Sequence, residues 1–164
     1  MPDAPPQRRD PRLIPLSHDH HHALARAREV VLALEGKALD GTPGTIGLDA
    51  LAVRLAAFCG GELAAHFARE EDHLLPAYRA AGDAPLAAET ERQHAHLRAL
   101  AAALDTDRAG PLAERLLAWS RAITGHVRFE ERELFPAVQA ALDEGALTAL
   151  GKILADGAGP ACHP

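Results

Sequence analysis

Two segments of the chain, residues 66–76 and 126–136, carry the same pattern of ionisable and apolar residues. Each begins with a histidine, continues with two adjacent glutamates, and ends with two large apolar residues and a proline. Positions i and i+4 lie above one another on a helix, so His66 with Glu70, and His126 with Glu130, aim an imidazole and a carboxylate at one point. Each copy is therefore suited to holding a metal ion.

Two further histidines fall on the apolar stripes of other expected helices. His94 lies on a stripe that includes Thr90 and Leu97. His20 lies between Leu16 and Leu24, but the neighbouring histidines leave the register open, and His21 is the alternative. Imidazole is the commonest transition-metal ligand in proteins. Four helices would thus bring four histidines and two glutamates into one slice of a bundle.

A slice with that composition needs cations. An unpaired ionised carboxylate in an apolar interior costs on the order of several kcal/mol. Two metal ions would offset this cost if both glutamates bridge them and two imidazoles complete each ion. Nitrogen and oxygen ligands without thiolates suit iron or manganese, with zinc as an alternative. Octahedral ions would keep open positions, which favours a site that binds a small molecule.

Four more residues of the repeated motif need a role. His73 and Glu133 lie one turn beyond the paired glutamates, and we expect them to support the ligands from behind or to pair across the core. Direct metal contact by His73 is an alternative, as is contact with water at the bundle end. Glu71 and Glu131 are rotated off the stripe, so we expect them in solvent or paired with arginines of neighbouring helices.

The composition favours an all-α protein that does not bind nucleic acid or membranes. Ala and Leu dominate the apolar residues, whereas strand-forming residues are scarce. A formal charge of −6 disfavours nucleic acid and anionic lipid as partners. Two cysteines without a C-x-x-C motif argue against a disulfide framework. No segment is apolar and long enough to span a bilayer, so a cytoplasmic location is expected.

The hydrophobic periodicity predicts an up-down-up-down four-helix bundle over residues 13–144. Residues 1–12 are expected to form an irregular arm, and residues 145–164 a short helix followed by a loose tail with Cys162. The first helix should begin near Pro15 or Ser17, with Ser17 as the cap, and end before Gly36. The other three helices are expected at about 48–80, 86–104 and 111–142, with a kink or an end at Pro76.

The paired H-F-x-x-E-E-x-x-L-L-P and H-x-x-x-E-E-x-x-L-F-P motifs resemble those of the hemerythrin-like (HHE cation-binding) domain, over about residues 16–140. The resemblance implies a four-helix bundle with a non-haem di-iron centre, its two ions bridged by oxo or hydroxo when loaded with iron. It implies that the metal ligands are His20, His66, Glu70, His94, His126 and Glu130.

The chain departs from the oxygen-carrying members of that family. Those proteins have a second histidine one turn after the third-helix histidine, where this chain has Arg98, and an aspartate on the last helix, where this chain has Glu130. The departure disfavours reversible oxygen transport. It favours the bacterial members, which are associated with iron handling, with responses to nitric oxide or oxygen, and with peroxide chemistry.

Three functional hypotheses follow. The first is a di-iron protein that binds or senses oxygen, nitric oxide or peroxide, or that handles iron. The second is a redox enzyme that turns over peroxide or nitric oxide or repairs iron centres with the same residues. The third is an interaction bundle that holds zinc or no metal. No output domain is visible, so signalling would need a protein partner or oligomerisation, and neither is identified by the sequence.

Overall fold

The structure is a computed structural model, and it describes residues 8–44, 46–104 and 110–156. These residues form helices and no strand, apart from an isolated bridge between Lys37 and Pro43. The prediction of an all-helical protein is therefore confirmed. No helix in this part of the chain combines the length and apolar character needed to cross a membrane. Cys162 and the expected tail lie outside the described residues.

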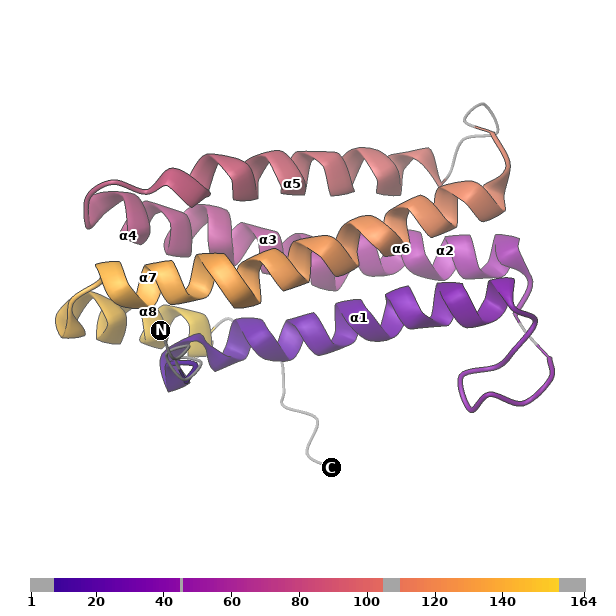
Figure 1. The fold of residues 1–164 in the computed structure, drawn as a ribbon, viewed down its shortest axis with the longest axis horizontal. Coiled ribbons are helices and arrows are strands. Elements are labelled where there is room, and N and C mark those ends of the chain that lie inside the picture. Colours follow the sequence, from indigo (N-terminus) through magenta and orange to yellow (C-terminus); the bar gives the residue numbers. More distant parts are fainter. Residues whose placement is uncertain (1–7, 45, 105–109, 157–164) are drawn as a thin grey trace, which may run out of the picture.

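Four long helical stretches run along one axis, and successive stretches reverse direction (Figure 1). The first is α1 (Ile14–Leu34) and the third is α5 (Pro85–Ala103). The second joins α2 (Leu48–Phe58), α3 (Ala64–Arg69) and α4 (Leu75–Ala80), and the fourth joins α6 (Leu112–Phe129) and α7 (Phe135–Ala141). The short helix expected after residue 144 is α8 (Glu144–Asp156), which packs against the turn Pro11–Leu13 that precedes α1.

The first helix begins at Ile14, next to the predicted start at Pro15, but its cap differs from the prediction. A 3-10 turn, η1 (Pro11–Leu13), leads directly into α1, and the Asp10 side chain accepts a hydrogen bond of 2.9 Å from the Arg12 backbone N–H at its start. The chain is thus already helical before Ser17, and Ser17 is not the cap. The capping function falls to Asp10 because Pro11, which lacks an N–H, suits the first helical position.

Three wide π-helical turns interrupt the second and fourth stretches without breaking them. They are η2 (Cys59–Leu63), η3 (Glu70–Leu74) and η4 (Glu130–Leu134). A π-turn closes i→i+5 hydrogen bonds and so takes up one extra residue. Because η3 precedes Pro76, the helix continues through this proline to Ala80 instead of ending there.

The extra residue changes which side chains face the core after each glutamate. Leu74 and Leu134 are fully buried, whereas His73 is only half-buried and Glu133 is exposed. A regular α-helix would keep positions 73 and 133 on the ligand stripe, which is why the sequence pattern placed them there. The π-turns rotate them away from it.

Two apolar clusters fill the interior on either side of the histidine-glutamate slice. The larger, here called the main core, surrounds Trp119 with side chains from α1, α2, α5 and α6. The other, here called the end core, surrounds Phe135 and contains Leu13, Leu74 and the α8 residue Leu150. The polar slice is therefore closed by apolar packing at both ends.

Helix α8 fixes the N-terminal segment against the end core. The Arg12 guanidinium donates to the Glu144 carboxylate at 2.6 Å, and Gly151 is buried against the Arg12 side chain. A Cβ at position 151 would lie 2.7 Å from Arg12 Cβ and Cγ. Only glycine fits there without moving η1.

We expect Gly151→Ala to lower the free energy of unfolding by about 1–3 kcal/mol, the usual cost of overpacking a buried contact. Gly145→Ala, in the same helix, is the matched control, because its Cβ would meet only Asp143 Oδ1, at an ordinary 3.4 Å. Urea unfolding of both variants measures the difference. Equal stabilities of the two variants would contradict the tight contact between α8 and Arg12.

Candidate metal centre

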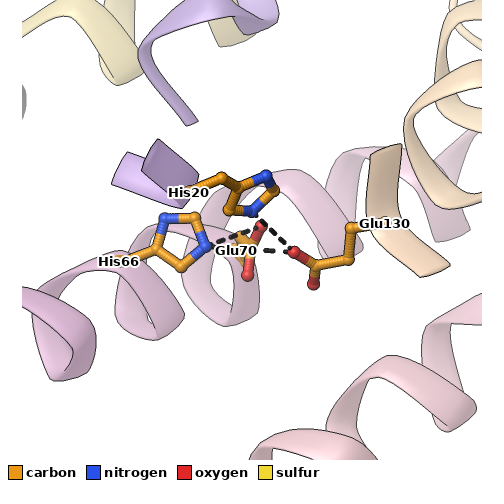
Figure 2. Close-up of side chains that lie close together, drawn as sticks. All are labelled: His20, His66, Glu70 and Glu130. Atoms are coloured by element: carbon orange, nitrogen blue, oxygen red, sulfur yellow. Dashed lines mark hydrogen bonds and ion pairs between the residues drawn. The ribbon is translucent and has the colours of Figure 1, made fainter. Parts of the chain in front are cut away.

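Six buried side chains from all four helical stretches meet in the slice between the two cores. They are the six ligands that the family resemblance implied. His20 comes from α1, His66 from α3 and Glu70 from the start of η3. His94 comes from α5, His126 from α6 and Glu130 from the start of η4. Both glutamates have an exposed fraction of 0%, and Figure 2 shows them converging with His20 and His66.

The six side chains form two groups of four that share both glutamates. His20 and His66 complete one group, and His94 and His126 complete the other. Within each group, one nitrogen or oxygen atom per residue lies within 4.8 Å of the other three. Each group could hold one ion, with the two carboxylates between the ions. The helix-1 histidine in this arrangement is His20, whereas His21 is exposed.

Hydrogen bonding within the slice is incomplete. His20 Nε2 lies 3.0 Å from Glu130 Oε2, but the Nε2 atoms of His66, His94 and His126 are buried without a hydrogen-bond partner among the described residues. Both oxygens of Glu70 and one of Glu130 are also buried without a hydrogen-bond partner among these residues. Buried polar atoms are normally hydrogen-bonded, so a group of six such atoms calls for an explanation.

The distances between these atoms fit a shared cation. His126 Nε2 lies 3.2 Å from Glu130 Oε1, and His66 Nε2 lies 3.4 Å from Glu70 Oε1. Two ligand atoms that are each about 2.1 Å from one ion lie about 3.0 Å apart at a right angle, and farther apart at wider angles. The donor atoms are therefore spaced as ligands of one ion, and slightly too far apart for good hydrogen bonds.

A second ring of polar groups contacts the outer nitrogen of each of the four histidines in the slice. His20 Nδ1 contacts Glu131 Oε1 at 2.7 Å, and His66 Nδ1 contacts Asp19 Oδ2 at 3.0 Å. Donation from Nδ1–H selects the tautomer in which Nε2 carries a free lone pair toward the slice. That tautomer is the one that binds a metal.

The other two histidines are held from helix α5 and from η3. His94 Nδ1 contacts Glu71 Oε1 at 2.8 Å, and His126 Nδ1 contacts Gln93 Oε1 at 3.0 Å. Gln93 directly precedes His94 in the chain, so α5 supplies both a candidate ligand and the partner of another.

Each carboxylate of this outer ring also contacts an arginine. Arg9 lies 2.7 Å from Glu131, Arg98 lies 2.8 Å from Glu71, and Arg69 donates to Asp19. Glu71 thus pairs with an arginine of a neighbouring helix, as expected, whereas the partner of Glu131 is Arg9, which lies before η1 in the segment expected to be an irregular arm. Their contacts with His94 and His20, and the roles of Asp19 and Gln93, were missed by the sequence reasoning. His73 and Glu133, expected behind the ligands, belong to neither group of four.

Burial and neighbouring charges shift the pKa values of the ionisable groups in the slice. Burial alone would lower the pKa of His66 and His94, but the carboxylates around them raise these values to about 10 and about 9. Burial lowers the pKa of His126 to about 4, and the neighbouring imidazoles act in the same direction. Burial and the charge of Glu130 raise the pKa of Glu70. Without metal, protonated imidazoles thus supply the positive charge that the carboxylates need.

These shifts predict how the stability of the metal-free protein depends on pH. The raised pKa values of His66 and His94 contribute stability that is complete below their unfolded value of 6.5 and is lost as the pH rises to 9–10. The lowered pKa of His126 contributes stability that is lost as the pH falls from 6.5 to about 4. The free energy of unfolding should therefore decline in alkali, and the raised pKa of Glu70 adds to this loss as the pH rises.

Unfolding of chelator-treated protein across this pH range, with and without added Mn²⁺, measures the effect. Metal should suppress the alkaline decline, because metal binding requires neutral imidazoles and strengthens as protons leave. His66→Gln should flatten the decline of the metal-free protein, whereas His96→Gln, at an exposed position, should not. A flat alkaline profile for the metal-free wild type would contradict this charge arrangement.

Comparison with protein families finds a match over most of the chain. The model of the hemerythrin HHE cation-binding domain matches residues 12–138, which include all six residues of the slice and most of the chain. Comparisons with curated proteins and with solved structures gave no significant match. The family match and the buried His/Glu groups together indicate a metal-binding site with iron as the favoured metal. The chain belongs to the hemerythrin HHE cation-binding domain family.

Proposed function

We propose that this protein is an up-down-up-down four-helix bundle of hemerythrin type that binds two iron ions and, through them, a small ligand such as oxygen, nitric oxide or peroxide, or that handles iron. His20 and His66 would hold one ion and His94 and His126 the other, with Glu70 and Glu130 shared. The observation that carries the proposal is the set of buried nitrogen and oxygen atoms that face one another without hydrogen bonds.

A network of hydrogen bonds explains this set less well than cations do. Glu70 has an exposed fraction of 0%, and neither of its oxygens accepts a hydrogen bond within the described residues. Its oxygens lie 3.2 Å from His94 Nε2 and 3.4 Å from His66 Nε2, and these contacts stabilise the carboxylate only while both imidazoles are protonated. A half-satisfied polar network is worse than an apolar core. Two divalent cations would satisfy the carboxylate oxygens and the three unpartnered Nε2 atoms together.

The donor set supports iron over softer metals. Each ion would receive two imidazole nitrogens and two carboxylates, and Cys59, the cysteine within the described residues, lies outside both groups. Imidazole and carboxylate ligands suit iron and manganese, whereas tetrahedral sites rich in thiolate are typical of zinc. Zinc and manganese remain the alternatives for the same ligands.

Two features support a small exogenous ligand. An ion that prefers six ligands keeps free positions after four protein ligands, and bound iron supplies ligand binding and electron transfer. A cavity of about 440 Å³ lies between α2, α3 and α5. The residues that line it are mainly apolar, and Phe67 is one of them. The Phe67 ring stacks on His94 with a centroid distance of 3.9 Å. We propose that small apolar molecules reach the His94 side of the centre through this cavity.

A redox enzyme would use the same residues. Steady turnover of peroxide or nitric oxide by the iron-loaded protein would favour an enzyme over a binding or sensing protein.

Metal content tests the proposal. Protein produced with iron should contain about two ions per chain, and Glu70→Ala or Glu130→Ala should lose most of it, because each glutamate is shared by both groups. Glu133→Ala is the matched control, since it removes an exposed glutamate from the same motif and should leave the content unchanged. Elemental analysis measures the result. Metal-free wild-type protein, or equal content in all three variants, would refute the proposal.

A further inference from the structure

The two halves of the proposed centre differ in what holds the outer histidine nitrogens. On the His20–His66 side, both Nδ1 atoms contact carboxylates, those of Glu131 and Asp19. On the other side, His94 Nδ1 contacts the carboxylate of Glu71, but His126 Nδ1 contacts the neutral amide of Gln93. Three histidines thus have an anionic partner and one does not.

The contacts of Gln93 fix its amide in this orientation. Gln93 Nε2 donates to Glu89 Oε1 at 2.7 Å, which leaves Oε1 to accept from His126. Glu89 in turn accepts from Arg92 Nε at 2.8 Å. A carboxylate is therefore present near His126, but the amide of Gln93 stands between the two.

The difference matters because the partner of the outer nitrogen tunes the inner one. A carboxylate that accepts from Nδ1–H increases the basicity of Nε2 and fixes the ring for its metal, and losing such a partner typically costs 10–100-fold in metal affinity. A neutral amide accepts a weaker hydrogen bond than a carboxylate does. The imidazole of His126 should therefore be the weakest metal ligand of the four histidines.

We propose that Gln93 is a positioning residue that makes the two metal positions unequal, so that the His94–His126 position binds its ion more weakly than the His20–His66 position. This inference rests on the proposed function, because it assumes that both groups bind metal. The weaker position is also the one next to Phe67 and the cavity. The ion that exchanges more readily would thus be the one nearer the proposed entry route.

The structure offers a charge-neutral test in the double variant Glu89→Gln/Gln93→Glu. This exchange places a carboxylate at position 93, against His126 Nδ1, and an amide at position 89. The net charge of the chain does not change. Calorimetric titration of metal-free protein with Mn²⁺, which does not oxidise in air as Fe²⁺ does, measures the two affinities. We expect two binding events in the wild type, and in the exchanged variant a weaker event that tightens about tenfold toward the stronger one.

Two single variants separate this role from a merely structural one. Gln93→Ala should weaken only the weaker event, whereas Asp19→Asn, which weakens a partner of His66, should weaken only the stronger event. Ala99→Glu adds a charge at an exposed position of α5 and should change neither. A gain of affinity in the exchanged variant cannot come from loss of packing.

Each outcome has one interpretation. Two bound ions whose affinities are unchanged by the exchange, or changed equally by Gln93→Ala, would overturn the role of Gln93 and leave the proposed function intact. Should the exchanged variant fail to fold, a selective effect of Gln93→Ala supports the role and an equal effect on both events overturns it. No Mn²⁺ or iron binding by the wild type would instead refute the proposed function.

Discussion

Two carboxylates without access to water lie at the centre of this structure, and the groups around them must compensate their charge. Glu70 and Glu130 lie side by side in the interior, and like charges at that depth repel one another in a medium that screens them little. Four imidazoles surround them, and both clusters of apolar side chains exclude solvent from the slice. The buried carboxylates therefore require positive charge nearby. Protonated imidazoles supply part of this charge, and two cations would supply all of it.

Most of the fold and all six members of the slice could be predicted from sequence, because they depend on one periodicity. The repeat of His66 and Glu70 in His126 and Glu130 places side chains one turn apart on an apolar stripe, and such a stripe faces a core wherever it occurs. The stripe through Leu16 and Leu24 favoured His20 over His21, and it is His20 that the structure places in the slice. Helix ends were predicted to within a few residues, since proline and glycine mark them.

What the sequence did not predict depends on tertiary contacts and on a departure from the α-helical period. The π-turns begin at Glu70 and Glu130, and nothing in the residue pattern alone distinguishes them from regular helix. His73 and Glu133 were therefore expected behind the ligands, but the π-turns rotate them away from the ligand stripe. Asp19 and Gln93 act on histidines of other helices, which no local pattern reveals. One signal was available: the second glutamate recurs in both motif copies as strictly as the first, which indicates a shared task.

Anomalous diffraction at the iron edge, from crystals of protein grown with iron, would show directly whether two ions lie in the slice. Two bound iron ions would give two peaks between Glu70 and Glu130, one beside the Nε2 atoms of His20 and His66 and the other beside those of His94 and His126. A well-ordered crystal with the six side chains in place and no anomalous peak among them would contradict the proposed iron binding.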